Sequence, residues 1–286
     1  LYRDVNLIVA PGTHFELDYW GADGLTVSAK TDGSVSLRAY VANAQEGDSV
    51  QFEILDAEGK TAAEGFTPAK SECRMELMIP DVHLWQGVED PYLYRVTARI
   101  VRHNEAVDAV STRLGVREFR VDPEKGFFLN GRSMPLRGVS RHQDRLGIGN
   151  APRKEDHEED ARLFRELGAN TVRLAHYQHN QAFYDACDEL GLIVWAEIPF
   201  ISVMNRDPAA HENCRSQIQE LVYQNFNHPS ICFWGISNEI TIGGELPGLV
   251  DNLKDLNALV KSMDPTRLTT MEQVSMLPMD SEVNRI

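Results

Sequence analysis

The sequence predicts a multidomain β and α/β chain, in which an immunoglobulin-like β-sandwich over residues 1–118 precedes a truncated (β/α)8 barrel of the TIM type over residues 119–286. Turn residues separate short alternating segments in the first part, which is typical of an all-β domain. Apolar strands alternate with amphipathic helices in the second part, which is typical of parallel strands covered by helices. Polar side chains end the first four of these strands, as in barrels whose strand ends form one site.

The first domain consists of strands joined by turn residues. Segments such as LTVSAKTDGSVSLRAYVANAQ and CRMELMIP alternate apolar and polar residues, and DG, EGD, AEGK and HNEA interrupt them about every 8–12 residues. About seven such strands fit an immunoglobulin-like sandwich. In HLWQGVEDPYLYRV, Trp85 is either a sugar-stacking side chain or part of a corner between two strands, and we favour the corner.

The second domain begins with a strand and a short hairpin at LNGR, and then repeats a strand and a helix. Asn180 is a suitable N-cap for the second helix, and Gly168 and Gly191 are stop signals for the first two helices. The predicted strands cover 135–142, 171–177, 192–200, 231–239 and 268–277, and the predicted helices lie near 154–167, 180–190, 209–226 and 248–262. About five of the eight strands of a barrel are therefore expected.

A doubly wound sheet is the alternative architecture for this pattern. It would normally carry a glycine-rich phosphate loop after its first strand, and RHQDRLGIGN does not match G-x-G-x-x-G. In a barrel, by contrast, the carboxyl ends of the strands converge on one mouth, so polar residues there should face a common cleft. The residues that end the first four strands are Arg141, His142, His176, Tyr177, Glu197, Asn238 and Glu239.

Composition limits the partners that the protein can bind. The net charge is −15 and the pI is about 5.0, which argues against nucleic acid and against an anionic membrane as partners. The four cysteines are scattered, which indicates free thiols in a reducing compartment. No segment resembles a signal peptide or a membrane span, and the chain opens at Leu1 as an excised piece would. We expect a cytoplasmic bacterial protein.

The strand ends carry the chemistry of a sugar site. Asn238 can both donate and accept hydrogen bonds, which suits a sugar hydroxyl, and Trp234 in the same strand would contribute to an aromatic floor. Glu239 follows directly and supplies a carboxyl group. Glycosidases cleave with two carboxyl groups, one of which protonates the leaving oxygen. The pattern therefore favours a glycosidase over a thiol or serine hydrolase.

Three stretches carry a family resemblance. They are GVREFRVDPEKGFFLNGRSMPLRGVSRHQD, ANTVRLAHYQHNQAFYDACDELGLIVWAEIPF and NHPSICFWGISNE, and they resemble glycoside hydrolase family two, most closely its β-galactosidases. The resemblance implies retaining hydrolysis of a terminal β-galactoside through a covalent glycosyl-enzyme. It also implies that Glu239 is the general acid/base, that Asn238 contacts the sugar 2-hydroxyl, and that His142 and His176 bind the substrate.

The departures from the family pattern concern the second carboxylate and the metal. The family's nucleophile is a Glu on the seventh strand, which we expect beyond residue 286, so these residues alone should be inactive. Glu272 lies on the wrong strand, and we interpret it as structural. Some relatives bind Mg²⁺ through a Glu and a His after the third strand, but IPFISVMN contains neither. We expect no metal site of that kind and no required cofactor.

Several alternatives stay open. A β-glucuronidase or β-mannosidase of the same family is the first, although SRHQD favours a galactosidase, and a non-catalytic carbohydrate-binding or scaffold piece is the second. Asp144 is a candidate sugar contact, and Glu197 either binds the substrate or orients its neighbours. His176 and His179 form an H-x-x-H that lacks the helical geometry of a zinc site. We expect a carbohydrate as partner and a homo-oligomer at full length.

Overall fold

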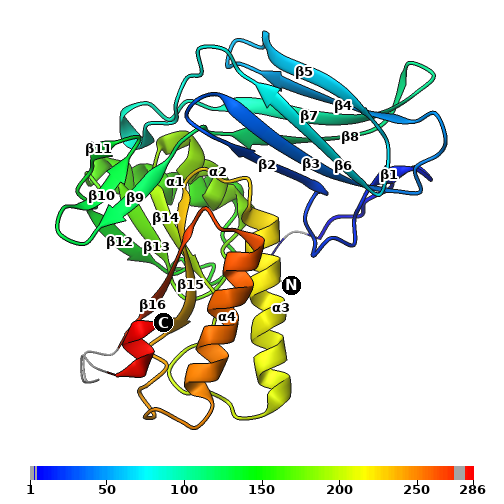
Figure 1. Cartoon of the computed structure of the whole chain (residues 1–286). Helices are drawn as coiled ribbons and strands as arrows, with labels where there is room; N and C mark the ends of the chain where they lie inside the picture. The colour runs from blue at the N-terminus through cyan, green and yellow to red at the C-terminus, as the bar shows by residue number, and fades with distance from the viewer. Residues whose placement is uncertain (1–2, 4, 274–280) are drawn as a thin grey trace.

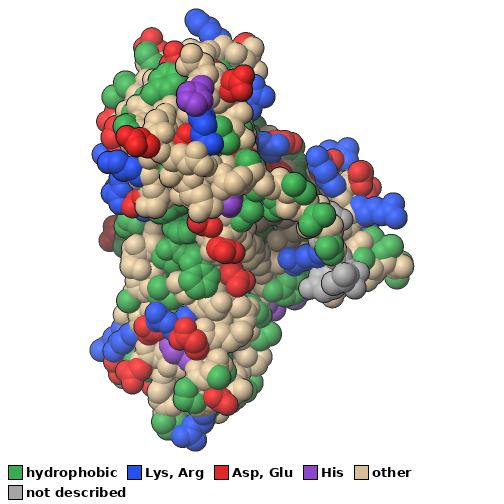
Figure 2. All heavy atoms as spheres, turned by 90° about the vertical axis from the view of Figure 1, so that its right-hand side faces the viewer, with side chains coloured by type: hydrophobic (Ala, Val, Ile, Leu, Met, Phe, Trp, Pro, Cys, Tyr) green, Lys and Arg blue, Asp and Glu red, His purple; other side chains and the backbone are tan. Residues whose placement is uncertain are grey.

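The computed structural model describes residues 3, 5–273 and 281–286. An all-β domain lies against a half-barrel of parallel strands with helices on its outer side (Figure 1). On the face in Figure 2, acidic and basic side chains are interspersed over the surface. Among the described residues, no helix is both long and apolar enough to cross a membrane.

The all-β domain is a sandwich of two antiparallel sheets. Alternate residues face its core, as in β4, where Val50, Phe52 and Ile54 are fully buried between half-buried neighbours. The first sheet consists of β1 (His14–Phe15), β2 (Leu25–Ala29), β3 (Ser34–Ala42) and β6 (Glu72–Met78). The second sheet consists of β5 (Thr61–Pro68), β4 (Ser49–Leu55), β7 (Tyr94–Arg102) and β8 (Glu105–Leu114).

A small sheet joins the sandwich to the barrel. It consists of β9 (Phe119–Asp122), β10 (Gly126–Leu129) and β11 (Arg132–Ser133). Phe127 and Leu129 pack on Ile193 and Cys232, which lie near the start of two barrel strands, so this sheet covers the amino-terminal end of the half-barrel. Trp85 completes the same cluster, is fully buried and donates to the Asp188 carbonyl at 2.9 Å. The predicted corner is therefore confirmed, because a buried Trp85 cannot stack on a sugar.

The half-barrel is a five-stranded parallel sheet in chain order, as the sequence predicts. Its strands are β12 (Gly138–Arg141), β13 (Thr171–Leu174), β14 (Ile193–Glu197), β15 (Ile231–Asn238) and β16 (Leu268–Glu272). Its helices are α1 (Lys154–Glu166), α2 (Gln181–Leu190), α3 (Pro208–Asn225) and α4 (Leu249–Met263). Two short 3₁₀ turns, η1 (Gly87–Glu89) and η2 (Glu282–Arg285), lie in the loops.

Local sequence signals set the limits of α2. The Asn180 side chain accepts from the Ala182 amide at 2.9 Å and caps the helix. Gly191 ends it in the left-handed region, with a φ of 73°. A Cβ on Gly191 would lie 2.1 Å from the backbone of Gly87, so this glycine also lets the sandwich domain approach the barrel.

Candidate active site

Arg173 lies at the centre of the polar groups at the barrel mouth. It projects from β13, and its Nε and Nη2 donate to the two carboxylate oxygens of Glu197 at 2.9 and 3.0 Å. Its Nη1 lies 3.5 Å from a carboxylate oxygen of Glu272, and its Nη2 also donates to Oδ1 of Asn238. The guanidinium lies 4.9 Å from the ring centre of Trp195. One cation therefore connects the ends of β14, β15 and β16.

Glu197 is held from two sides. The side chain is fully buried, and Oε1 lies 2.6 Å from Nδ1 of His176 in addition to its contact with Arg173. Both oxygens of this carboxylate are occupied by Arg173 and His176, which it holds in place. Because the side chain is not exposed, it offers no free face to a sugar. Of the two roles considered for Glu197, this geometry favours orienting its neighbours.

An irregularity in β15 turns Asn238 toward the mouth. Phe233 and Gly235 face the barrel interior, whereas Trp234 and Ile236 pack in the core beneath the helices. Strict alternation would place Asn238 on the helix side. The register with β16 shifts between Gly235 and Ser237, and this shift brings Asn238 to the interior side, where it meets Arg173.

Glu239 follows Asn238 at the rim of the half-barrel. Its φ of 47° is left-handed, so the strand stops there. Its amide donates to the Glu272 carbonyl at 2.8 Å, and its own carbonyl accepts from Ile242 at 3.0 Å. The residue is half-buried. The predicted acid/base is thus at the carboxyl end of β15, directly beside the Arg173 network.

Two predicted histidines meet on the other side of the mouth. The rings of His142 and His176 are 5.2 Å apart and nearly perpendicular. Tyr177 joins them, with its hydroxyl 3.5 Å from Nδ1 of His142. Asp144 is exposed on the loop after β12. Arg141 ends β12, directly before His142, but does not face the cleft. Its side chain is 3% exposed and forms an ion pair with Asp160 on the helix side.

The prediction for Trp234 is wrong. Its side chain is fully buried on the helix side of β15, and its indole nitrogen donates to Asp264 at 2.9 Å. Trp195 takes the interior position instead, and with Phe233 and Arg173 it lines a cavity of about 350 Å³ inside the half-barrel. Trp195 precedes Glu197 by two residues on the same strand, so period-two alternation could have identified it.

Sequence reasoning also missed Arg173. An isolated charged residue within the apolar segment TVRLAHY requires partners of opposite charge, because an unpaired buried charge is costly. That signal could have identified it. Glu272, interpreted from the sequence as structural, is one of those partners.

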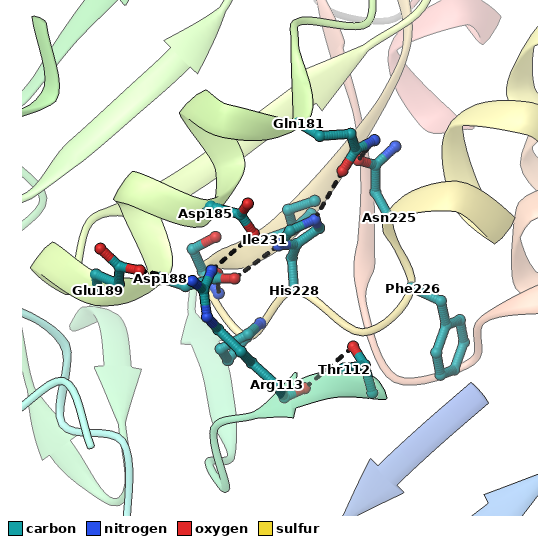
Figure 3. A network of polar contacts seen from close by, with 12 residues as sticks. Thr112, Arg113, Gln181, Asp185, Asp188, Glu189, Asn225, Phe226, His228 and Ile231 are labelled. Atoms are coloured by element: carbon teal, nitrogen blue, oxygen red, sulfur yellow. Dashed lines mark hydrogen bonds and ion pairs between the residues drawn. The ribbon is translucent and has the colours of Figure 1, made fainter. Parts of the chain in front are cut away.

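A second group of titratable side chains lies away from the mouth, between α2 and the sandwich. Ligand atoms of Asp185, Asp188 and His228 lie within 4.8 Å of one another (Figure 3). They are already paired: Asp188 lies 2.6 Å from Nδ1 of His228, and Asp185 lies 2.8 Å from a guanidinium nitrogen of Arg113. We interpret this group as an ion-pair and hydrogen-bond network that joins the two domains.

Residues 120–286 match the model of the glycosyl hydrolases family 2 TIM barrel domain, and residues 24–117 match that of glycosyl hydrolases family 2. The chain belongs to glycosyl hydrolase family 2. This confirms both the resemblance and the predicted fold class, a sandwich followed by part of a barrel.

Among the relatives of this chain, some are named β-glucuronidases and others β-galactosidases. A β-glucuronidase of Bacteroides fragilis is 38% identical over an alignment 289 residues long, which covers 94% of this chain and 41% of that protein. A β-galactosidase of Thermoanaerobacter pseudethanolicus is 30% identical over 279 residues, covering 94% of this chain and 36% of that protein. The chain therefore spans well under half the length of these relatives.

A solved structure closely matches this family 2 chain. The crystal structure of an FMN-binding β-glucuronidase from Faecalibacterium prausnitzii L2-6 is 48% identical, with a TM-score of 0.93, and the match covers 96% of this chain and 43% of that one. The sandwich and the half-barrel are therefore arranged here as they are in that enzyme.

Proposed function

We propose that this chain supplies the acid/base half of the active site of a retaining β-glycosidase, with Glu239 as the general acid/base. The observation that carries the proposal is the position of Glu239 at the carboxyl end of β15, directly after Asn238, whose side chain Arg173 holds. Protonation of the leaving oxygen and later activation of water would both use this carboxyl group.

The neighbouring side chains would bind the sugar. Because Oδ1 of Asn238 accepts from Arg173, the N–H groups of the amide suit a sugar 2-hydroxyl. Because Glu197 occupies Nδ1 of His176, the second ring nitrogen suits another hydroxyl. His142 stands beside that ring and would extend the same row of contacts.

The nucleophile would come from outside these residues. Glu197 is buried and held by Arg173 and His176, and Glu272 lies within ion-pair distance of the same guanidinium. Both carboxylates are therefore already paired with Arg173. We infer that a carboxylate on a later barrel strand completes the pair, at the separation of about 5 Å that retaining enzymes use.

For the substrate, we propose a β-glucuronide. The likeness to two glucuronidases, at 38% and 48% identity, supports this choice over the galactoside that SRHQD suggested. A glucuronate carboxylate needs a cation, and Glu197 and Glu272 already neutralise Arg173. The cation that recognises the sugar acid would therefore also come from a later part of the barrel.

A flavin has no role in this proposal, although one similar enzyme is FMN-binding. A cavity of about 500 Å³ between the sandwich and the barrel is lined by Asp23, Asp185 and Asp188 as well as by Arg95 and Arg113. Three carboxylates against two guanidiniums do not fit a doubly charged phosphate. Hydrolysis by two carboxyl groups needs no redox cofactor, so the proposed reaction does not use a flavin.

The test uses the full-length protein and aryl β-glycosides that differ only in their sugar. We expect kcat/KM to be highest for the β-glucuronide, below it for the β-galactoside, and lowest for the β-mannoside. A clear preference for the galactoside would overturn the substrate assignment and leave the role of Glu239 intact. Absence of turnover on all three sugars would overturn the proposed function itself.

A second arm addresses Glu239 directly. Glu239→Gln should slow a substrate with a poor leaving group about 10²- to 10⁴-fold, because that step needs a proton, and should slow formation of the glycosyl-enzyme from a dinitrophenyl glycoside far less. Glu212→Gln is the matched control, since Glu212 is 76% exposed on α3. Equal losses for both leaving groups would contradict the acid/base role.

A further inference from the structure

A buried network on the helix side of the sheet lies behind the loop that carries His176. Arg141 ends β12, and its Nε and Nη2 donate to Asp160 on α1 at 3.0 and 2.6 Å. The same guanidinium faces two imidazoles: its Nη2 lies 3.0 Å from Nδ1 of His157, and its Nη1 lies 3.1 Å from Nδ1 of His179. Both rings are fully or almost fully buried.

These two contacts decide where the imidazole protons lie. A guanidinium only donates, so Nδ1 of each ring must accept, and the proton of each neutral ring is on Nε2. A charged ring would direct a second N–H at Arg141. Burial, and then this guanidinium, lower the pKa of His157 to about 4 and that of His179 to about 3, so both rings are neutral near pH 7.

The proton on His179 has an acceptor next to the site. Its Nε2 lies 3.1 Å from the Ala175 carbonyl oxygen, and the Ala175 amide donates to the Arg141 carbonyl at 3.0 Å. The Ala175 carbonyl belongs to the planar peptide group that leads into His176. His176 in turn lies 2.6 Å from Glu197. A continuous series of contacts therefore runs from Arg141 to the mouth.

We propose that His179 is a positioning residue for the sugar site. Arg141 fixes its tautomer, its Nε2–H fixes the peptide group between Ala175 and His176, and this sets the His176 ring against Glu197. The H-x-x-H of the sequence thus contains His176, which belongs to the site, and His179, which positions it. The kinetic part of this inference rests on the proposed glycosidase function, and the structural part does not.

Two substitutions separate the two bonds of the His179 ring. His179→Asn places an oxygen near the Nδ1 position, so it keeps the acceptor for Arg141 and loses the donor to Ala175. His179→Gln places an amide N–H near the Nε2 position, so it keeps the donor and loses the acceptor. Each variant loses one buried hydrogen bond, so a merely structural role predicts similar decreases in Tm and similar kinetics for both.

In the full-length protein, we expect His179→Asn to lose about 10- to 100-fold in kcat/KM and His179→Gln to stay within about threefold of wild type. Crystal structures of both variants form the second arm. His179→Asn should lose the 2.6 Å contact between His176 and Glu197, and His179→Gln should keep it. Equal kinetic losses, or an intact contact in His179→Asn, would overturn the inference. The crystal structures need no substrate, so they test the positioning role of His179 even if the proposed glycosidase function is wrong.

Discussion

At the scale of single residues, Gly235 shows how tightly the mouth is packed. A Cβ at this position would lie 2.4 Å from Cβ of Glu197 and 2.6 Å from the indole nitrogen of Trp195. Glu197 cannot move freely, because it is held by Arg173 and His176. The ion-pair network around Glu197 therefore requires a residue without a side chain at position 235.

Gly235→Ala tests this packing. We expect the free energy of unfolding to fall by about 1–3 kcal/mol, because an overpacked core must shift, and we expect kcat/KM to fall with it. Gly12→Ala is the control, since a Cβ there would meet nothing within 4 Å. Thermal unfolding and steady-state kinetics measure the two effects, and wild-type kinetics in Gly235→Ala would show that the contact with Glu197 is not critical.

The buried histidines make stability depend on pH. The pKa of His157 is lowered to about 4, so between about pH 6.5 and pH 4 the unfolded chain binds a proton that the folded chain does not. His157 should therefore lower the free energy of unfolding by up to about 1.4 kcal/mol per pH unit as the pH falls through this window. His179, whose pKa is lowered to about 3, should add a similar slope. His157→Asn keeps an acceptor near Nδ1 and does not titrate, so it should remove the contribution of His157 and leave that of His179. Urea unfolding at pH 7, 6 and 5 measures it, and equal slopes in both proteins would contradict this account.

At the scale of elements, the loop between β13 and α2 connects the site to the helix layer. The Asn180 amide donates to Oε1 of Gln143 at 2.6 Å, and the Gln143 amide donates to the Tyr177 hydroxyl at 3.1 Å. The Asn180 side chain caps α2. Residues 175–180 are therefore fixed at both ends, which suits a loop that presents His176.

Removal of the cap tests the coupling between the helix and the loop. Asn180→Ala should lower the free energy of unfolding by about 1 kcal/mol and reduce kcat/KM, because the first turn of α2 anchors the loop. Asn180→Ser keeps a capping oxygen and should recover most of both losses. Differential scanning calorimetry and kinetics compare the three proteins. A stability loss with unchanged kinetics would show that the helix end does not position His176.

The helices and strands could be predicted from the sequence. Which side of a strand each side chain occupies could not always be predicted. Apolar runs, Asn180 and Gly191 place the strands and α2 to within a few residues, because capping and periodicity are local. Residues 274–277 of the fifth predicted strand lie outside the described residues. The shift in β15 depends on its pairing with β16, which is a tertiary property. For this reason strict alternation from Asn238 wrongly places Trp234 in the cleft. Trp195, by contrast, lies on β14 and follows the ordinary alternation with Glu197.

At the scale of the whole molecule, side chains from the sandwich end anchor it to the barrel. Arg117 donates to the carbonyls of Pro229 and Ile231, each at 2.9 Å. Arg113 forms ion pairs with Asp185 and Glu189 on α2 (Figure 3). The second set is 40–54% exposed, so solvent and salt weaken it.

This difference predicts unequal effects. Arg117→Met should lower the free energy of unfolding by about 1–3 kcal/mol, because it leaves backbone carbonyls near the junction without this donor. Arg113→Met should cost less than about 1 kcal/mol, with a loss that shrinks further at high salt. Denaturant unfolding at two salt concentrations measures both, and a larger loss for Arg113→Met would reverse the assignment.

For the full-length protein, a homo-oligomer in the bacterial cytoplasm stays a prediction.

The central claim is that Glu239 is the acid/base of a retaining glycosidase. Glu239→Ala in the full-length protein should still form the glycosyl-enzyme from a dinitrophenyl β-glycoside but should hydrolyse it slowly, because water lacks a base. Azide needs no base, so it should accelerate turnover of this variant, leave wild type unaffected and yield a β-glycosyl azide. No acceleration by azide, or an α-glycosyl azide as the product, would contradict the account.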